Sequence, residues 1–68
     1  MKLVVNGEPT DVEPGATVAD IVARLGHAPE GRGIAVAVNG EVVARGEWGA
    51  TPVGERDRIE VLNAVGGG

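Results

Sequence analysis

The sequence IAVAVNGEVVA, residues 34–44, carries the strongest folding signal in this 68-residue chain. Three branched side chains, at Ile34, Val36 and Val38, alternate with two alanines, which is the period-two pattern of a strand with one buried face. Asn39-Gly40 follows, and this pair favours a two-residue hairpin turn because both central positions of that turn need a positive φ. The stretch therefore predicts a strand over 34–38, a tight turn, and a returning strand over 41–44.

The start of the chain repeats this arrangement in a weaker form. Residues 1–6 alternate, and Asn6-Gly7 is a second hairpin signal. A short strand over 10–13 is expected to return along the first, until Pro14-Gly15 stops it. The first 15 residues thus predict another antiparallel pair.

Between the two hairpins lies one helical segment. Thr17 is the expected N-cap, with Asp20 three residues later as its capping-box partner. An apolar stripe follows at helical spacing, formed by Val18, Ile21, Val22 and Leu25. Gly26 supplies the C-terminal stop, and 27–33 is expected to form a loop.

The rest of the chain predicts one further strand, over Arg58 to Leu62, after an irregular segment with a helical turn near Trp48. The order strand-strand-helix-strand-strand-strand predicts an α+β domain in which about five short strands form a mixed sheet under one main helix. Ubiquitin-like, or β-grasp, domains have this order. We expect a β-grasp domain over residues 1–63 and a flexible glycine-rich tail over residues 64–68.

The alternation assigns two faces to the predicted sheet. The inner face, under the helix, carries Leu3, Val5, Ile34, Val36, Val38, Ile59 and Val61. The outer face carries small or apolar residues at Val4, Ala35, Ala37 and Leu62. These residues form either a docking patch for a partner or ordinary scattered apolar surface. Trp48, the only aromatic residue, is favoured as a core residue over an interface residue.

Composition narrows the function. Ten acidic residues against six basic ones give a formal net charge of −4, which argues against nucleic-acid binding and suits a partner with a basic surface. The chain has no cysteine, and we expect an intracellular, cytoplasmic protein because secreted domains of this size usually need disulfides. No apolar run approaches the roughly 20 residues of a membrane span, and no signal peptide is expected.

The last residues, AVGGG at 64–68, are the candidate site. Three glycines have no side chains to pack, but they allow passage through a narrow channel. Fully extended, residues 64–68 span roughly 17 Å, far enough to carry a terminal carboxylate into another protein's active site. Coupled to AMP, that carboxylate would become a mixed anhydride that a sulfur nucleophile can attack, giving a thiocarboxylate at Gly68. Without cysteine, no side-chain thiol could carry the sulfur instead.

Several motifs together resemble the ThiS family, the bacterial sulfur carrier proteins of thiazole (thiamine) biosynthesis. They are residues 34–40, Val43-Ala44-Arg45 with Trp48, residues 57–61 and the terminal residues 64–68. One departure is Glu55-Arg56, which lengthens the turn between Gly54 and Asp57 by one or two residues relative to the family pattern.

The resemblance implies a cycle performed on this protein rather than by it. A ubiquitin-activating-type adenylating enzyme would use ATP and magnesium to activate Gly68, and a cysteine desulfurase relay would supply sulfur. Thiazole synthase would accept it. Gly66 and Gly67 would enter the partners' active sites, and Val65 joins the outer-face residues as a candidate docking position. The chain itself is expected to bind no cofactor.

Other functions stay open at this stage. The small subunit of molybdopterin synthase, or a carrier for cysteine synthesis or tRNA thiolation, would share the tail chemistry. A ubiquitin-like modifier joined to target lysines through Gly68, or a plain interaction module, belongs to a different class. The sequence shows no nucleophile-base set, P-loop or dinucleotide fingerprint, so we expect no catalytic residues. His27, the only histidine, has no companion ligands for a metal.

Overall fold

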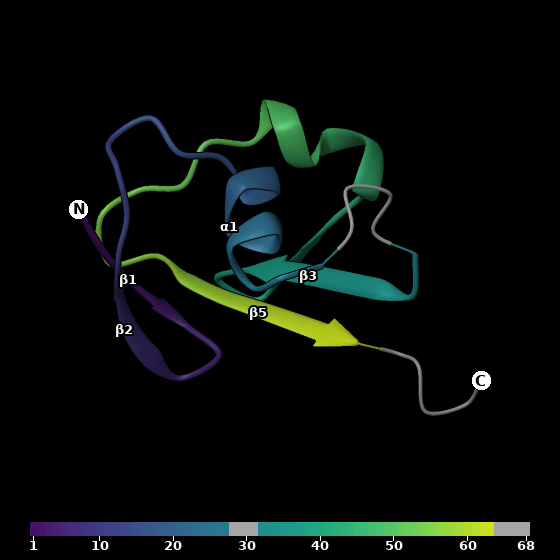
Figure 1. The fold of residues 1–68 in the computed structure, drawn as a ribbon, viewed down its shortest axis with the longest axis horizontal. Coiled ribbons are helices and arrows are strands. Elements are labelled where there is room, and N and C mark those ends of the chain that lie inside the picture. The colour runs from purple at the N-terminus through teal and green to yellow at the C-terminus, as the bar shows by residue number, and fades with distance from the viewer. Residues whose placement is uncertain (28–31, 64–68) are drawn as a thin grey trace.

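The computed structural model describes residues 1–27 and 32–63 and contains the predicted elements in the predicted order (Figure 1). The elements are β1 (Lys2–Val5), β2 (Glu8–Asp11), α1 (Val18–Arg24), β3 (Ile34–Val38), β4 (Glu41–Val43), a 3-10 helix η1 (Arg45–Ala50) and β5 (Arg58–Asn63). The helical turn expected near Trp48 is η1.

The five strands form one mixed sheet in the order β2-β1-β5-β3-β4. The first and the last strand pair in parallel, whereas the β1–β2, β3–β4 and β3–β5 pairs are antiparallel. Helix α1 lies across one face of this sheet (Figure 1). The expected α+β architecture, with one helix over a mixed sheet, is confirmed.

Both Asn-Gly pairs form the expected two-residue turns. Asn6 and Gly7 have φ values of 51° and 84°, and Asn39 and Gly40 have 51° and 88°. Positive φ at both central positions is the signature of a type I′ turn, whose twist matches that of the strands it joins. Glycine stands at the second position because it adopts a positive φ without the strain that a Cβ brings.

The start of the second strand was predicted wrongly. We expected it at Thr10, but β2 begins at Glu8, because a two-residue turn pairs Val5 directly with Glu8. Pro9 lies inside β2 despite having no N–H to donate. It is tolerated there because β2 is at the edge of the sheet and pairs with β1 alone.

The helix begins as predicted and ends slightly earlier. The Thr17 N–H donates to Asp20 Oδ2 at 2.9 Å, and the Asp20 N–H donates to Thr17 Oγ1 at 3.4 Å, so the capping box is complete. Leu25 was expected on the buried stripe, but it is 41% exposed. It is the C-cap, after which Gly26 turns the chain away with φ of 87°, so Leu25 does not face the sheet.

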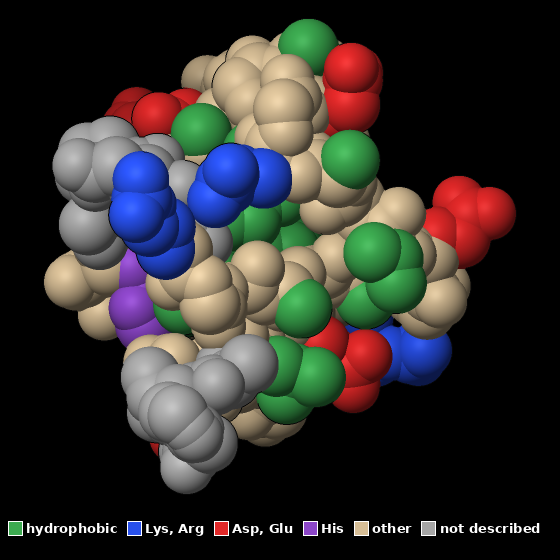
Figure 2. All heavy atoms as spheres, turned by 90° about the vertical axis from the view of Figure 1, so that its right-hand side faces the viewer, with side chains coloured by type: hydrophobic (Ala, Val, Ile, Leu, Met, Phe, Trp, Pro, Cys, Tyr) green, Lys and Arg blue, Asp and Glu red, His purple; other side chains and the backbone are tan. Residues whose placement is uncertain are grey.

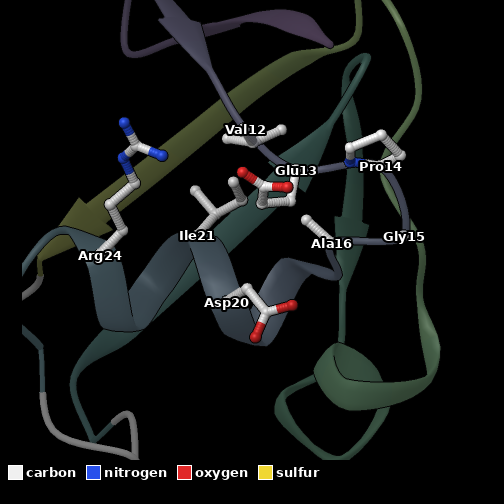
Figure 3. Close-up of a pocket in the computed structure, with 8 residues that line it drawn as sticks. All are labelled: Val12, Glu13, Pro14, Gly15, Ala16, Asp20, Ile21 and Arg24. Carbon is white, nitrogen blue, oxygen red and sulfur yellow. The ribbon is translucent and has the colours of Figure 1, made fainter.

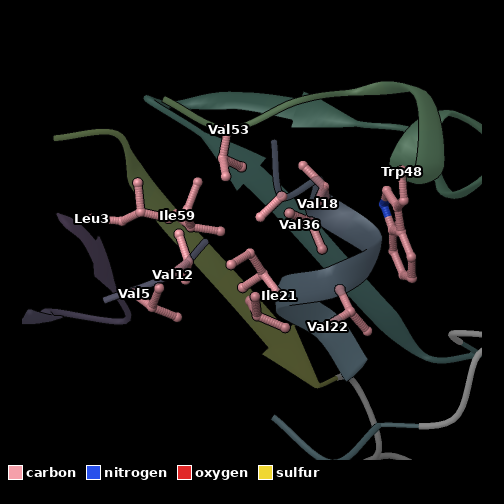
Figure 4. Packing of buried hydrophobic residues seen from close by; sticks show 12 residues of the cluster. Leu3, Val5, Val12, Val18, Ile21, Val22, Val36, Trp48, Val53 and Ile59 are labelled. Atoms are coloured by element: carbon pink, nitrogen blue, oxygen red, sulfur yellow. The ribbon is translucent and has the colours of Figure 1, made fainter. Parts of the chain in front are cut away.

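The core lies between the sheet and α1 and is apolar throughout the described residues (Figure 4). Its members are Leu3, Val5, Val12, Ala16, Val18, Ile21, Val22, Val36, Trp48, Val53, Ile59 and Val61. Ile34 and Val38 of the predicted inner face are half-buried against this cluster. Trp48 is 4% exposed, and its Nε1–H donates to the Val43 carbonyl at 3.0 Å, which confirms the core interpretation.

The longer turn before β5 spans Gly54 to Asp57. The Asp57 N–H donates to the Gly54 carbonyl at 3.1 Å, and the Gly54 N–H donates to Asp57 Oδ2 at 2.6 Å. Arg56 has φ of 69°, the left-handed region that disfavours residues with a Cβ. Its N–H donates to the Lys2 carbonyl at 2.7 Å, so the turn is tied to the start of β1.

Replacing Arg56 with glycine is expected to stabilise the protein. The substitution relieves left-handed strain of roughly 1–2 kcal/mol but adds the unfolded-state entropy of glycine, so the free energy of unfolding should rise by about 0.5–1 kcal/mol. Urea unfolding followed by Trp48 fluorescence measures this change. Glu55→Gly, at the neighbouring position without a positive φ, is the control and should lower stability by about 0.5–1 kcal/mol. Equal losses in both variants would contradict the strain argument.

Candidate functional site

The strand that leads to the glycine-rich end is the middle strand of the sheet. Strand β5 pairs with β1 on one side and with β3 on the other. The β3 pairing runs from Val38 opposite Ile59 to Ile34 opposite Asn63, the last described residue. The point at which the chain leaves the sheet is therefore fixed by hydrogen bonding to β3. The predicted tail residues Val65, Gly66, Gly67 and Gly68 lie outside the described residues.

Two asparagine side chains also hold β5. The Val61 N–H donates to Asn6 Oδ1 at 2.8 Å, and the Arg58 N–H donates to Asn39 Oδ1 at 2.9 Å. The sequence had indicated these asparagines only as turn formers. Each turn of the two hairpins thus reaches sideways and satisfies a backbone N–H of the central strand.

The outer face of the sheet brings together three of the predicted docking residues and one that the sequence reasoning missed. Ala35 lies opposite Leu62, and Ala37 lies opposite both Glu60 and Val42. Leu62 is 66% exposed and Val42 is 79% exposed. We call the set Ala35, Ala37, Val42 and Leu62 the apolar patch. Val42 was predictable, since the two-residue turn at Asn39-Gly40 fixes it opposite Ala37.

Val4 does not belong to the apolar patch. It is half-buried on β1, where its register partners are Pro9 and Arg58. Leu62 lies four residues beyond Arg58 on β5. Strand β5 also stands between β1, which carries Val4, and β3, which carries the two alanines. On the outer face of the sheet, the exposed large apolar side chains Val42 and Leu62 therefore lie on β4 and β5, on either side of β3.

Charge accompanies the apolar patch. Glu60 is exposed and shares its register position with Ala37, so it stands among the patch residues. Figure 2 looks onto the end of the molecule at which β5 finishes, and there hydrophobic side chains lie exposed beside acidic ones. A partner that covers this surface would need apolar contacts together with a basic group for Glu60.

A cavity of about 390 Å³ lies elsewhere, between the end of the first hairpin and the helix (Figure 3). It is lined by Val12, Glu13, Pro14, Gly15, Ala16, Asp20, Ile21 and Arg24. These lining residues include no Ser, Thr, Cys, His or Lys that could act as a nucleophile. Asp20 already serves the capping box. The cavity is on the helix side of the sheet, away from the apolar patch.

Two further searches bear on the class of site. Among residues 1–27 and 32–63, no three His, Cys, Asp or Glu side chains gather closely enough to hold a metal ion. In the same part of the chain, no helix is long and apolar enough to cross a membrane.

These features define a small domain of the ubiquitin-like, or β-grasp, class, with a central strand that ends beside an exposed apolar patch. Residues 3–68 match the model of the ThiS family. The chain belongs to the ThiS family, as its sequence motifs had suggested.

Solved structures agree with this assignment. The chain is similar to the crystal structure of a thiamine biosynthesis protein (ThiS) from Geobacter metallireducens, with 36% identity, a TM-score of 0.81 and full coverage of both chains. It is also similar to the solution structure of a thiamine biosynthesis protein from the same organism, with a TM-score of 0.79 and coverage of 100% of this chain and 88% of the other.

Two curated relatives are longer proteins. The chain is 46% identical over 68 residues to a thiazole synthase of Magnetococcus marinus, and 34% identical to one of Paramagnetospirillum magneticum. Each match covers the whole of this chain and only 20% of the relative. The chain therefore spans about a fifth of the length of these relatives.

Neighbouring residues on β5 test the assignment of faces. Leu62→Ser should change the free energy of unfolding by no more than about 0.5 kcal/mol, because the side chain is largely in solvent. Val61→Ser should lower it by about 2–3 kcal/mol, because it removes buried apolar area and places a hydroxyl in the core. Urea unfolding of both variants measures the difference. A larger loss at Leu62 than at Val61 would reverse the assigned faces.

Proposed function

We propose that this protein is a sulfur carrier of thiamine biosynthesis, whose Gly68 carboxylate becomes a thiocarboxylate and donates its sulfur to a thiazole synthase. The observation that carries the proposal is the match to the ThiS family, which extends over residues 3–68 and so includes the terminal glycines. The same match favours this role over the small subunit of molybdopterin synthase. Partner proteins bind the folded domain, and the chemistry takes place at the Gly68 carboxylate.

The proposed reaction has two steps, both in partner active sites. In the first, a Gly68 carboxylate oxygen attacks the α-phosphorus of ATP, and pyrophosphate leaves. An adenylating enzyme of the ubiquitin-activating type supplies ATP and magnesium. In the second, sulfur from a cysteine desulfurase, released from its persulfide as hydrosulfide by a thiol reductant, attacks the acyl carbon. AMP leaves, and a C–S bond replaces the C–O bond of the anhydride to give the Gly68 thiocarboxylate.

The described geometry supports this division of labour. Asn63 is paired with Ile34, so the body is firmly structured up to the start of the glycine-rich segment. Five further residues, fully extended, reach about 17 Å. We propose that the apolar patch docks on each partner while Gly66 and Gly67, having no Cβ, occupy the narrow approach to the reaction centre.

The curated relatives support a thiazole synthase as the acceptor. Two proteins named thiazole synthase contain a segment that is similar to this whole chain. In those proteins the similar segment and the rest of the sequence belong to one polypeptide. We infer that this domain serves the same kind of partner. The body of such a carrier has no reaction of its own to catalyse.

Intact-mass spectrometry tests the proposal on the protein ending at Gly68, purified from cells without a C-terminal tag. The expected result is a fraction whose mass has gained the difference between sulfur and oxygen, located at Gly68 by fragmentation. Incubation with the adenylating enzyme, ATP and magnesium should yield the acyl adenylate. If no adduct forms there, the carrier role fails and an interaction module takes its place. An isopeptide to lysine would instead identify a modifier.

Deleting Gly68 should abolish complementation of a thiamine auxotroph lacking its own carrier, without altering the fold.

Gly67→Val should block adenylation, because a branched side chain would obstruct the approach to the reaction centre. Pyrophosphate release measures adenylation. The control is Ala23→Ser, a small substitution on the exposed surface of the helix, far in sequence from the chain end. A glycine such as Gly33 is unsuitable, because its φ of 72° makes any side chain there strained. Normal adenylation of Gly67→Val would remove the steric argument.

The double variant Val42→Asp/Leu62→Asp should weaken binding to the adenylating enzyme by about tenfold or more, because it places charges on the apolar patch. Isothermal calorimetry with the purified enzyme measures this. Leu25→Asp is a matched control, since Leu25 is also an exposed leucine but lies at the end of the helix. Equal losses in both proteins would show that the patch is not the docking surface.

A further inference from the structure

The two Asn-Gly turns have closely similar φ values, and each holds β5 through one backbone and one side-chain hydrogen bond. The Asn6 N–H donates to the Ile59 carbonyl at 2.9 Å, and the Asn39 N–H donates to the Arg58 carbonyl at 2.7 Å. Both Oδ1 atoms accept an N–H of β5, at 2.8 Å for Asn6 and 2.9 Å for Asn39. With φ values of 51° at both asparagines, the two sites form a matched pair within one molecule.

One contact separates them. Asn39 Nδ2 donates to Asp57 Oδ1 at 3.0 Å, whereas Asn6 Nδ2 has no hydrogen-bond acceptor among the residues that the structure describes. Asp57 is itself held, because its Oδ2 accepts the Gly54 N–H at 2.6 Å. The Asn39 amide is thus fixed at both ends, while the Asn6 amide is fixed at its oxygen alone.

Asparagine followed by glycine is prone to a covalent change. The backbone nitrogen of the glycine attacks the side-chain carbonyl carbon, a C–N bond forms, and the side-chain nitrogen leaves as ammonia. Water then opens the cyclic imide to aspartate or isoaspartate. Glycine favours this reaction because no Cβ shields its nitrogen or restricts its backbone, and asparagine is among the thermolabile residues for this reason.

We propose that Asn6 is the open deamidation site of this protein and Asn39 a locked one, with Asp57 as the lock. To bring its carbonyl carbon to the Gly40 nitrogen, the Asn39 side chain must leave Asp57 as well as β5. The additional hydrogen bond is made to a carboxylate, and such bonds are stronger than neutral ones. Asn6 has to break only its contact to the Val61 N–H before it can react with Gly7.

The consequences of aspartate at the two positions also differ. A carboxylate at position 6 can still accept the Val61 N–H, so the central strand keeps its contact. A carboxylate at position 39 replaces the donor that faces Asp57 with a second negative charge. Like charges at hydrogen-bond distance repel each other. The lock therefore lies at the turn where the modified product would be damaging.

The first test measures the rates at both sites in one sample. The folded protein is incubated in mildly alkaline buffer, and peptide mass spectrometry follows the exchange of the amide NH₂ for OH. Asn39 should react about tenfold more slowly than Asn6, the factor expected for one charge-assisted hydrogen bond. In Asp57→Ala the ratio of the two rates should move toward one. Because both sites share the sample, a general loss of stability accelerates both and leaves the ratio interpretable.

Glu55→Ala, a carboxylate removed from the same turn, should leave the ratio unchanged. Equal rates at Asn6 and Asn39 in the unmodified protein, or a ratio that Asp57→Ala does not alter, would overturn the proposal.

The second test uses stability. Asn39→Asp should lower the urea midpoint of unfolding clearly more than Asn6→Asp. Combining Asn39→Asp with Asp57→Asn should restore most of the midpoint, because the exchanged pair again places an amide N–H opposite a carboxylate and keeps an oxygen for the Gly54 N–H. A merely structural role of Asn39, without the amide–carboxylate contact, predicts no such rescue.

Discussion

The pairing of β5 with β1 and β3 is the interaction on which the rest of the structure depends. Each hairpin is a local structure, held by a two-residue turn, and an isolated two-stranded hairpin is marginal in water. Strand β5 enters between them and joins them into one sheet of five strands. Only then does the sheet offer a continuous apolar face for α1 to cover. Ile59, at the start of this strand, is fully buried at the centre of the resulting core.

Because β5 is central, its backbone needs hydrogen-bond partners on both sides along its length. Strand β3 pairs with β5 from Ile59 to Asn63, but the parallel pairing with β1 involves only Val4 with Arg58 and Val5 with Ile59. The hairpin turn continues where β1 stops, since the Asn6 side chain accepts the Val61 N–H. A side chain thus extends a backbone ladder beyond the end of a strand. No buried polar side-chain atom is left unpaired among the described residues.

The sequence predicted those parts of the fold that local chemistry determines. The turns at Asn39-Gly40 and Asn6-Gly7, the Thr17 capping box and the alternating core residues were all readable from short patterns. Leu25 was wrongly assigned to the buried stripe, because its spacing in the sequence fits the helical period although the helix ends at Arg24. The cross-strand contact of Asn6 with Val61 spans 55 positions, and nothing local could reveal it. For the candidate site, three members of the apolar patch were predicted and Val42 was recoverable from register.

The place of β5 in the sheet also has a consequence for how the protein is made. The middle strand of the sheet comes after all the other described elements along the chain, so both hairpins and the helix are synthesised before the strand that completes the core. Chains generally begin to fold from the N-terminus during synthesis. Here the two hairpins and the helix cannot form a core until β5 is available to join the hairpins into one sheet. A chain interrupted before residue 58 would display Leu3 and Val36 to solvent and to proteases. The fold can therefore be completed only after β5 has been synthesised, and until then the unfinished chain is open to cellular proteolysis.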